Sequence, residues 1–240
     1  MIEIDEYGLT GQGRLRAGIN LGNVLLVTGT SDSGNPMGLS PAIAAAIARS
    51  LGFSVAYCTY PSPGAVADAV DEDEWDICLI AEDPKRAETI EFCGAYAEIE
   101  ATYMVPAGSK LARLEDVDKP GVRIAVSDRS AYDLYLSRVL KHAELKRAPG
   151  LKAAFELFRD QKLDALAGLR PALLENAESM AGARVLDGAY TAVRQAVGVR
   201  PGNPALAKAV KRFVSEAKST GLVEGMINEF GQRGRLSVAS

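Results

Sequence analysis

Arg86 is the residue of this sequence whose type and position best suit the binding of an anion. It follows an apolar run, 77–81, that ends at Glu82 and Asp83 and is broken by an Asp-Pro turn. A short apolar run between an acidic cluster and a turn predicts a buried strand of a parallel sheet. Ligands of open α/β sheets bind beyond the carboxyl ends of strands, where a guanidinium matches a carboxylate. Arg86 is therefore a candidate carboxylate-binding residue; the alternative is an exposed arginine after a turn.

Catalytic and metal sites find little support in the residue types. The single histidine, His142, falls near the end of an expected helix, where the helix dipole favours a solvated imidazole. No nucleophile motif accompanies it. Glu82 and Asp83 are adjacent on an extended segment and are expected to point to opposite faces, which does not suit acid–base catalysis. One histidine and three dispersed cysteines give no metal-ligand spacing, so we expect no metal, no cofactor and no enzyme activity.

Composition indicates a globular protein without a nucleic-acid partner. Apolar residues make up 48% of the 240 and charged residues 24%, and the net charge of −4 leaves no excess of cations to meet phosphates. No apolar run approaches the roughly 18 residues of a membrane span. Three cysteines leave at least one unpaired, and Cys78, in the middle of the expected strand, is interpreted as a small buried thiol.

The N-terminal residues are polar and acidic and lack the basic and apolar regions of a secretory signal. As written, the chain is expected in the cytoplasm; if a signal peptide has been removed, the expectation is periplasmic. Residues 1–13 are interpreted as a loose arm. Its Gly11-Gln12-Gly13 is no dinucleotide fingerprint, because no strand precedes it.

Apolar periodicity and turn residues predict a first β-α series. Ser40 is expected to cap a helix that begins at Pro41, and the charged residues 71–74 are expected to form a solvated loop. Alternation of strands and helices implies a parallel sheet with right-handed crossovers. The expected strands are 14–20, 53–60 and 77–81, and the expected helices are 41–51 and 65–70.

A second series follows a break at Pro106, Gly108 and Ser109. Asn203 is expected to cap a helix whose first residue is Pro204. The tail from residue 231 to 240 is expected to fray. Residues 101–106, before the break, are expected to be extended, as are 185–186 and 191–199. The expected strands after the break are 122–127, 144–148 and 163–167, and the expected helices are 130–141, 151–159, 171–180, one from 204 and 222–230.

Several stretches together resemble a known family. They are Gly-Asn-Pro-Met-Gly-Leu-Ser at 34–40, Trp-Asp-Ile through Asp-Pro-Lys-Arg to Phe-Cys-Gly-Ala-Tyr at 75–96, Val-Arg-Ile-Ala-Val-Ser-Asp-Arg-Ser-Ala-Tyr-Asp at 122–133, Leu-Asp-Ala-Leu-Ala-Gly at 163–168 and Arg-Pro-Gly-Asn-Pro-Ala-Leu at 200–206. Their order and spacing over about residues 14–230 are similar to those of the solute-binding proteins of polar amino-acid ABC transporters.

This resemblance implies an α/β fold of the type II periplasmic-binding-protein class, with two lobes that close on a ligand. Each lobe is expected to be a mostly parallel sheet flanked by helices, with two hinge strands joining the lobes. The expected boundaries are 1–101 plus 195–240 for lobe 1, 106–190 for lobe 2, and hinges near 101–106 and 190–199. An ABC transporter permease is implied as the protein partner, and no membrane-spanning segment is expected.

The resemblance also assigns ligand-binding residues. An arginine after the third strand of lobe 1 grips the ligand's α-carboxylate in the family, and Arg86 matches it. The start of the first helix of lobe 2 supplies hydroxyl and N–H groups to the same carboxylate, which a helix N-terminus suits. The loop after the first strand usually presents a polar residue and an aromatic one. The matching residues are Ser130, Ala131 and Tyr132 at the helix start, and Asn20 and Asn23 in the loop.

Two departures from the family pattern bear on the ligand. Amino-acid binders hold the ammonium with an acidic residue where this sequence has Gly168-Leu169-Arg170. Serines common before the arginine of lobe 1 are replaced by Ile80 and Ala81, with Glu82 next. Arg170 would add a second cation to the ligand site; the alternative is a capping or surface role. Glu82 could still receive an ammonium.

The leading hypothesis is therefore a protein that captures a small carboxylate, an amino acid or an organic acid, for ABC transport. The departures favour a dicarboxylate or an aromatic acid over a typical α-amino acid. Two alternatives stay open. Some members of this fold are dehydratases of cyclic carboxylates, and a cytosolic or fused ligand-sensing domain would account for the missing signal.

Overall fold

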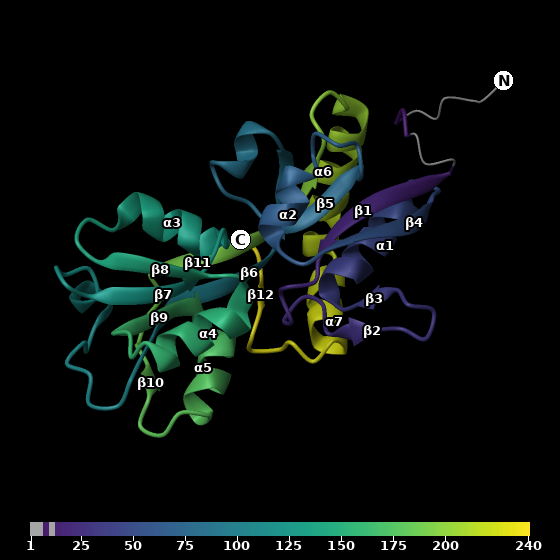
Figure 1. Ribbon diagram of the computed structural model, residues 1–240. Coiled ribbons are helices and arrows are strands. Elements are labelled where there is room, and N and C mark those ends of the chain that lie inside the picture. Colours follow the sequence, from purple (N-terminus) through teal and green to yellow (C-terminus); the bar gives the residue numbers. More distant parts are fainter. Residues whose placement is uncertain (1–6, 10–12) are drawn as a thin grey trace. The chain divides into compact units, whose positions relative to one another are not determined.

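The computed structural model, which describes residues 7–9 and 13–240, has an α/β fold (Figure 1). The predicted fold class, mostly parallel sheets flanked by helices, is confirmed. The chain divides into two compact units, which we call unit 1 (1–98 and 194–240) and unit 2 (99–193). The predicted arm at 1–13 and its Gly-Gln-Gly lie outside the described residues, apart from 7–9 and 13.

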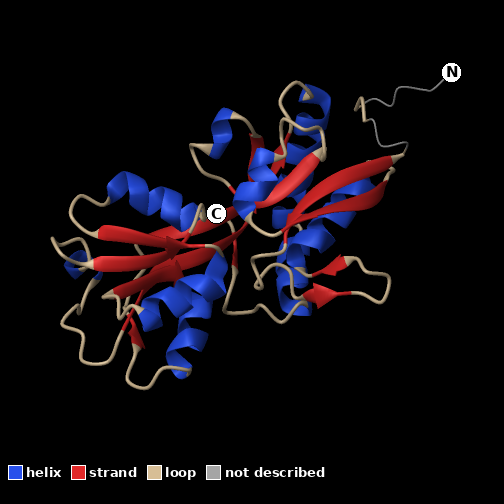
Figure 2. Ribbon diagram, in the orientation of Figure 1, coloured by secondary structure: helices blue, strands red, loops and turns tan. Residues whose placement is uncertain are grey.

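The sheet of unit 1 has the strand order β4-β1-β5-β11-β6. Figure 2 shows strands in red and helices in blue. β4, β1 and β5 are parallel, with Ala17 opposite Tyr57 on one side and Ile77 on the other. β11 runs antiparallel to β5. β6 and β11 each continue from one unit into the other. The strands are β1 (Arg14–Asn20), β2 (Gly29–Thr30), β3 (Pro36–Met37), β4 (Ser54–Tyr60), β5 (Ile77–Ala81), β6 (Glu91–Val105), β11 (Thr191–Val199) and β12 (Ser237–Val238).

The helices of unit 1 begin at sites that local sequence defines only in part. Asn203 caps α6 as predicted, because its side-chain oxygen accepts the N–H of Leu206 at 3.1 Å. The prediction that Ser40 caps the first helix is wrong. Gly38 occupies that place at φ 132°, where a Cβ would overlap the carbonyl of Leu26. The helices are α1 (Leu39–Ser50), α2 (Pro63–Asp68), α6 (Pro204–Ser219) and α7 (Leu222–Glu229).

The sheet of unit 2 has the order β6-β9-β7-β8, with β7 parallel to both of its neighbours. α3 covers one face, and α4 and α5 cover the other (Figure 1). Phe158 on α4 is buried against Ala125 of β7 and Leu166 of β9. The elements are β7 (Arg123–Ser127), α3 (Ala131–Val139), β8 (Glu144–Ala148), α4 (Gly150–Asp160), β9 (Ala165–Leu169), α5 (Arg170–Glu178) and β10 (Arg184–Val185).

Two predicted segments differ from the structure in ways that have a physical cause. The strand expected at 163–167 begins two residues later, because the N–H of Leu163 donates to Phe158 and completes the turn that ends α4. The tail expected to fray is ordered. Ser237 of β12 lies opposite Glu98 of β6, and Ala239 is buried. A strand partner on β6 therefore fixes the tail.

Cys78 is fully buried in β5, as predicted, and burial raises the pKa of its thiol to about 12. The three cysteines are free. No helix within residues 7–9 and 13–240 has both the length and the apolar character needed to cross a bilayer.

Candidate functional site

Arg86 lies directly beyond the carboxyl end of β5, in a one-turn 3-10 helix (Arg86–Glu88). β5 is buried along its whole length, and only 5% of Arg86 is exposed. One guanidinium nitrogen, Nη1, donates a hydrogen bond to the carbonyl of Ala81 at 2.6 Å. The alternative of an exposed surface arginine is therefore wrong. A guanidinium keeps its charge when buried, so the end of β5 holds a fixed cation.

The turn that carries Arg86 is built by Asp83, which is also buried. The Asp83 carboxylate accepts the N–H of Lys85 at 2.9 Å, and its carbonyl accepts the N–H of Ala87 at 2.9 Å. These two bonds, one to the Asp83 side chain and one to its backbone, replace the ladder bonds that end with the strand. The Asp-Pro turn thereby positions Arg86.

Glu82 is committed to an ion pair inside unit 1. Its carboxylate lies 2.6 Å from Nε of Arg194, and Glu98 lies 2.5 Å from Nη1 of the same arginine. The hydrogen bond to Glu82 is the main cause that raises the pKa of Arg194. A ligand ammonium at Glu82 would have to compete with this guanidinium, so the role of Glu82 in ligand binding stays a prediction.

Asn20 and Asn23 both use their side-chain oxygens to shape the loop after β1. Asn20 accepts the N–H of Gly22 at 2.9 Å, and Asn23 accepts the N–H of Leu25 at 3.1 Å. Both are Asx-type turns. Their amide N–H₂ groups are the donors with which a ligand contact, as predicted, would be made.

The start of α3 offers backbone donors at the end of β7. Ser130, expected as the first residue of the helix, is its cap: its hydroxyl oxygen accepts the N–H of Asp133 at 3.1 Å. The first N–H groups of a helix have no intrahelical acceptor, so those of Ala131 and Tyr132 suit an anion. The Tyr132 side chain is buried, and burial raises the pKa of its hydroxyl to about 12 even though Ser130 and Ser127 hydrogen-bond to it.

Asp133 and Arg147 hold this helix start in place. Asp133 is buried; its carboxylate accepts the N–H of Arg129 at 2.9 Å and lies 3.0 Å from Nη2 of Arg147. Arg129 adopts φ 54°, an uncommon conformation for a residue with a side chain. The pair Asp133–Arg147 therefore fixes the turn that presents Ser130.

Arg170 is the first residue of α5 and is engaged within unit 2. Nε lies 2.6 Å from Glu100, Nη1 donates to the carbonyl of Leu186 at 3.4 Å, and Nη2 donates to the carbonyl of Gly188. These contacts support the structural alternative for Arg170. Its role as a second cation for a ligand stays a prediction.

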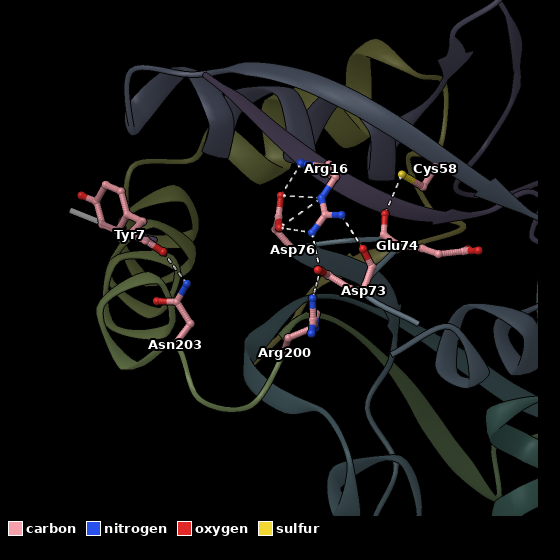
Figure 3. Close-up of polar contacts among 8 residues, drawn as sticks. All are labelled: Tyr7, Arg16, Cys58, Asp73, Glu74, Asp76, Arg200 and Asn203. Atoms are coloured by element: carbon pink, nitrogen blue, oxygen red, sulfur yellow. Dashed lines mark hydrogen bonds and ion pairs between the residues drawn. The ribbon is translucent and has the colours of Figure 1, made fainter. Parts of the chain in front are cut away.

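A separate polar cluster lies near the amino ends of β1 and β5 (Figure 3). Nη2 of Arg16 lies 2.7 Å from Asp76 and 2.7 Å from Asp73, and Arg200 pairs with Asp73 as well. The hydrogen bond to Asp76 is the main cause that raises the pKa of Arg16. The loop 71–74 is exposed as predicted, but it also ties β1 to the end of β11, which the sequence did not indicate.

Residues 24–233 match the model of the bacterial extracellular solute-binding proteins, family 3. The chain belongs to this family. The match covers more than half of the sequence and agrees with the family that the sequence resembles. A search of curated protein sequences found no match.

Solved structures share the fold of this family 3 protein at low sequence identity. An ancestral amino acid-binding protein, described as a precursor of cyclohexadienyl dehydratase, is 21% identical, with a TM-score of 0.75 over 91% of this chain and 95% of that chain. The substrate-binding protein of an amino acid ABC transporter is 18% identical, with a TM-score of 0.74 over 91% of this chain and 99% of that chain. A Streptococcus pneumoniae transporter protein bound to L-arginine is 16% identical, with a TM-score of 0.74 over 91% and 94%.

The family 3 protein also contains polar residues that sequence analysis did not select. A Ser-x-x-Asp spacing, Ser130 to Asp133, is a signal of a helix start and could have singled out Asp133. No local pattern marks Arg147 or Arg194, because their partners lie 14 and 112 residues away. His142 lies three residues beyond the end of α3 and is exposed. Its backbone N–H donates to the Asp118 carboxylate at 2.8 Å. The residues described hold no group of three or more metal-ligand side chains.

Proposed function

We propose that this family 3 protein binds a small carboxylate, an amino acid or an organic acid, and supplies it to an ABC transporter outside the cytoplasm. The observation that carries the proposal is Arg86, a guanidinium that is 5% exposed and lies beyond the carboxyl end of a buried strand. Arginine is rarely buried to this extent unless it is paired, and a guanidinium matches a carboxylate in geometry and charge. β6 and β11, which both units share, are the proposed hinges.

The similar structures support this ligand class. Their descriptions include an amino acid ABC transporter protein and a protein bound to L-arginine, which carries a carboxylate. In the proposed role Arg86 binds the carboxylate of the ligand. The N–H groups of Ala131 and Tyr132 and the Ser130 hydroxyl are proposed as further donors to an acid group.

The part of the ligand away from its carboxylate is proposed to lack an ammonium. Where family members hold that group with an acid, this chain has Leu169, which is buried, and Arg170, which pairs with Glu100. Glu82 is already paired with Arg194. A buried ammonium without its own carboxylate is costly. A dicarboxylate or an aromatic acid is therefore preferred over a typical α-amino acid.

Isothermal titration against the twenty amino acids and a set of dicarboxylates and aromatic acids tests the ligand class. We expect an organic acid to bind more tightly than any amino acid. Tight binding of an amino acid with no response to the other acids would contradict the preferred class and leave the carboxylate role of Arg86 standing. Recovery of the bound acid unchanged after incubation separates a binding protein from a dehydratase.

Arg86→Ala tests the carboxylate role of Arg86 directly. We expect at least a tenfold loss of affinity for the acid that titration identifies, with the circular dichroism spectrum retained. Arg49→Ala is the matched control, because Arg49 is an exposed arginine of the same unit. Ser130→Ala should cost less, since backbone donors remain. Unchanged affinity in Arg86→Ala would show that the proposed site is misplaced.

A further inference from the structure

Tyr190 of unit 2 carries a buried hydroxyl oxygen that has no hydrogen-bond partner among the described residues. The amide oxygen of Gln232 is the other described side-chain atom in this state. Leaving a buried hydroxyl unpaired costs free energy, and native proteins keep few such groups. An unpaired hydroxyl therefore needs a physical explanation.

The ring of Tyr190 packs against two other tyrosine rings of unit 2, and this packing sets where its hydroxyl lies. Its centroid lies 4.6 Å from that of Tyr103 on β6 and 5.9 Å from that of Tyr135 on α3, the latter ring stacked at 15°. The backbone N–H of Tyr190 donates to the carbonyl of Ala101 at 3.0 Å. Aromatic neighbours and a backbone bond fix both ends of the residue.

The groups that act electrostatically on the Tyr190 hydroxyl are those of Tyr103, Tyr132 and Tyr135 and the carboxylate of Asp133. Burial raises the pKa of Tyr190 well above its ordinary value and also raises that of Tyr103, so both remain protonated at neutral pH. Asp133 lies in the same neighbourhood, but its charge is paired with Arg147. An ammonium or guanidinium placed here would be a buried cation without a carboxylate of its own, whereas an uncharged oxygen would gain a hydrogen bond.

We propose that the Tyr190 hydroxyl donates a hydrogen bond to an uncharged oxygen, a carbonyl or a hydroxyl, of a small molecule bound by this protein. The inference rests on the proposed function, which gives that molecule a carboxylate, and adds that the molecule also carries an uncharged oxygen. A preorganised donor favours the compound that carries the oxygen over the analogue that lacks it. The site thus selects an oxo or hydroxy acid and rejects a cationic side chain.

The first test needs no added compound. Urea unfolding is compared for the wild type, Tyr190→Phe, Tyr96→Phe and Tyr135→Phe. Tyr96 is the control with a paired hydroxyl, 2.7 Å from that of Ser40, and Tyr135 is the control for a ring in the same cluster. We expect Tyr190→Phe to unfold at the same urea concentration as the wild type or a higher one, and Tyr96→Phe at a lower one. A drop for Tyr190→Phe as large as that for Tyr96→Phe would overturn the proposal, because the hydroxyl would then already have a partner.

The second test uses two pairs of acids that differ by one oxygen function, 2-oxoglutarate with glutarate and 4-hydroxybenzoate with benzoate. Titration of the wild type is expected to show at least tenfold tighter binding of the oxygen-bearing member of one pair. In Tyr190→Phe that preference is expected to fall below about threefold, while the member without the oxygen binds as before. The proposal would be overturned if Tyr190→Phe kept the preference for the oxygen-bearing acid. It would also be overturned if the wild type bound the two acids of a pair equally tightly in every pair that it binds.

Failure of the proposed function would look different. None of the four acids would raise the melting temperature of the wild type, or Arg86→Ala would bind them unchanged. If none of the four acids binds, the urea comparison alone shows whether the Tyr190 hydroxyl already has a hydrogen-bond partner in the protein. A destabilised Tyr190→Phe overturns it, and an equally stable or more stable one supports an open hydroxyl.

Discussion

Side-chain ties of unit 1, such as Arg194 with Glu82, cross between its two segments, whereas ties of unit 2, such as Arg170 with Glu100 across 70 residues, stay within one continuous segment. In unit 1 the ties join remote segments: Arg194 to Glu82 across 112 residues and Ser240 to Glu98 across 142. In unit 2 Asp133 pairs with Arg147 only 14 residues away and is capped by Ser130. Unit 1 is made of two segments, whereas unit 2 is one continuous stretch. The comparison teaches that remote side-chain pairs in unit 1 fasten its second segment, while the pair Asp133–Arg147 in unit 2 shapes a single turn.

The largest effect is expected at Arg194, where one guanidinium serves three partners of unit 1. Arg194→Ala removes the cation shared by Glu82 and Glu98 and the bond to the Ser240 hydroxyl at 3.2 Å. The free energy of unfolding should fall by about 2–3 kcal/mol, because hydrogen bonds to charged groups are the stronger kind. Urea denaturation measures the loss, and hydrogen exchange at the N–H of Ala239 should speed up if the tail is released.

A matched control for Arg194 is an exposed ion pair. Lys152 on α4 lies 3.9 Å from Glu156 and is 90% exposed. Lys152→Ala should change the free energy of unfolding by less than about 0.5 kcal/mol. A comparable change in the two variants would contradict the role of Arg194 as a tie between segments.

The next effect is expected at Arg147 and should stay within unit 2. Arg147→Met leaves the Asp133 carboxylate buried without its guanidinium partner, and we expect a loss of about 2 kcal/mol in the free energy of unfolding. The loss is smaller than for a fully buried pair, because 43% of the Arg147 side chain is exposed. Asp133→Asn should cost less, since Arg147 can turn to water. Hydrogen exchange should accelerate in α3 and leave β12 unchanged. Faster exchange in β12 would show that the two units are not fastened separately.

A smaller effect is expected at Tyr96, whose hydroxyl joins β6 to α1. Tyr96→Phe leaves the buried Ser40 hydroxyl, 2.7 Å away, without this partner. The free energy of unfolding should fall by about 1 kcal/mol. Thermal denaturation of Tyr96→Phe beside a Tyr96→Phe, Ser40→Ala double variant checks the cause. The double variant should regain part of the loss, and a further loss equal to that of Ser40→Ala alone would mean that the two hydroxyls do not depend on each other.

The smallest effect is expected at Asn203, which combines a local cap with a remote tie. Its oxygen accepts the N–H of Leu206, and its amide donates to the carbonyl of Tyr7 at 2.5 Å (Figure 3). Asn203→Asp keeps the cap and loses the tie, so we expect a loss of about 0.5 kcal/mol, against about 1 kcal/mol for Asn203→Ala. Calorimetry that finds no loss in Asn203→Asp would show that the contact with Tyr7 adds nothing, and equal losses in the two variants would show that the cap adds nothing.

The parts of the fold that local sequence determines could be predicted. The bounds of β1, β5, β8 and β11 follow from apolar runs and turn residues, and the cap of α6 follows from Asn203 and Pro204. Arg86 could be placed because the end of a strand is a local feature. Whether Arg86 is buried could not be derived, since it depends on how β5 is covered.

The parts that depend on remote partners could not be predicted. The tail was expected to fray because nothing within it indicates that Ser237 lies opposite Glu98. Ser40 fits the local pattern of a cap, but tertiary contacts, of Gly38 with Leu26 and of Ser40 with Tyr96, decide where α1 begins. The local sequence leaves Glu82 open to a ligand. Its partner Arg194 follows more than a hundred residues later, so no local pattern reveals the pair. Periodicity carries no information about such pairs.

The division of unit 1 into two segments has a consequence for biosynthesis. A ribosome that has made Val193 has already supplied every residue of unit 2, which can begin to fold as it emerges. The first segment of unit 1 must wait with the β5 edge uncovered until β11 arrives to pair with it. Nascent unit 1 is therefore the part of the chain most exposed to aggregation and to chaperones during translation.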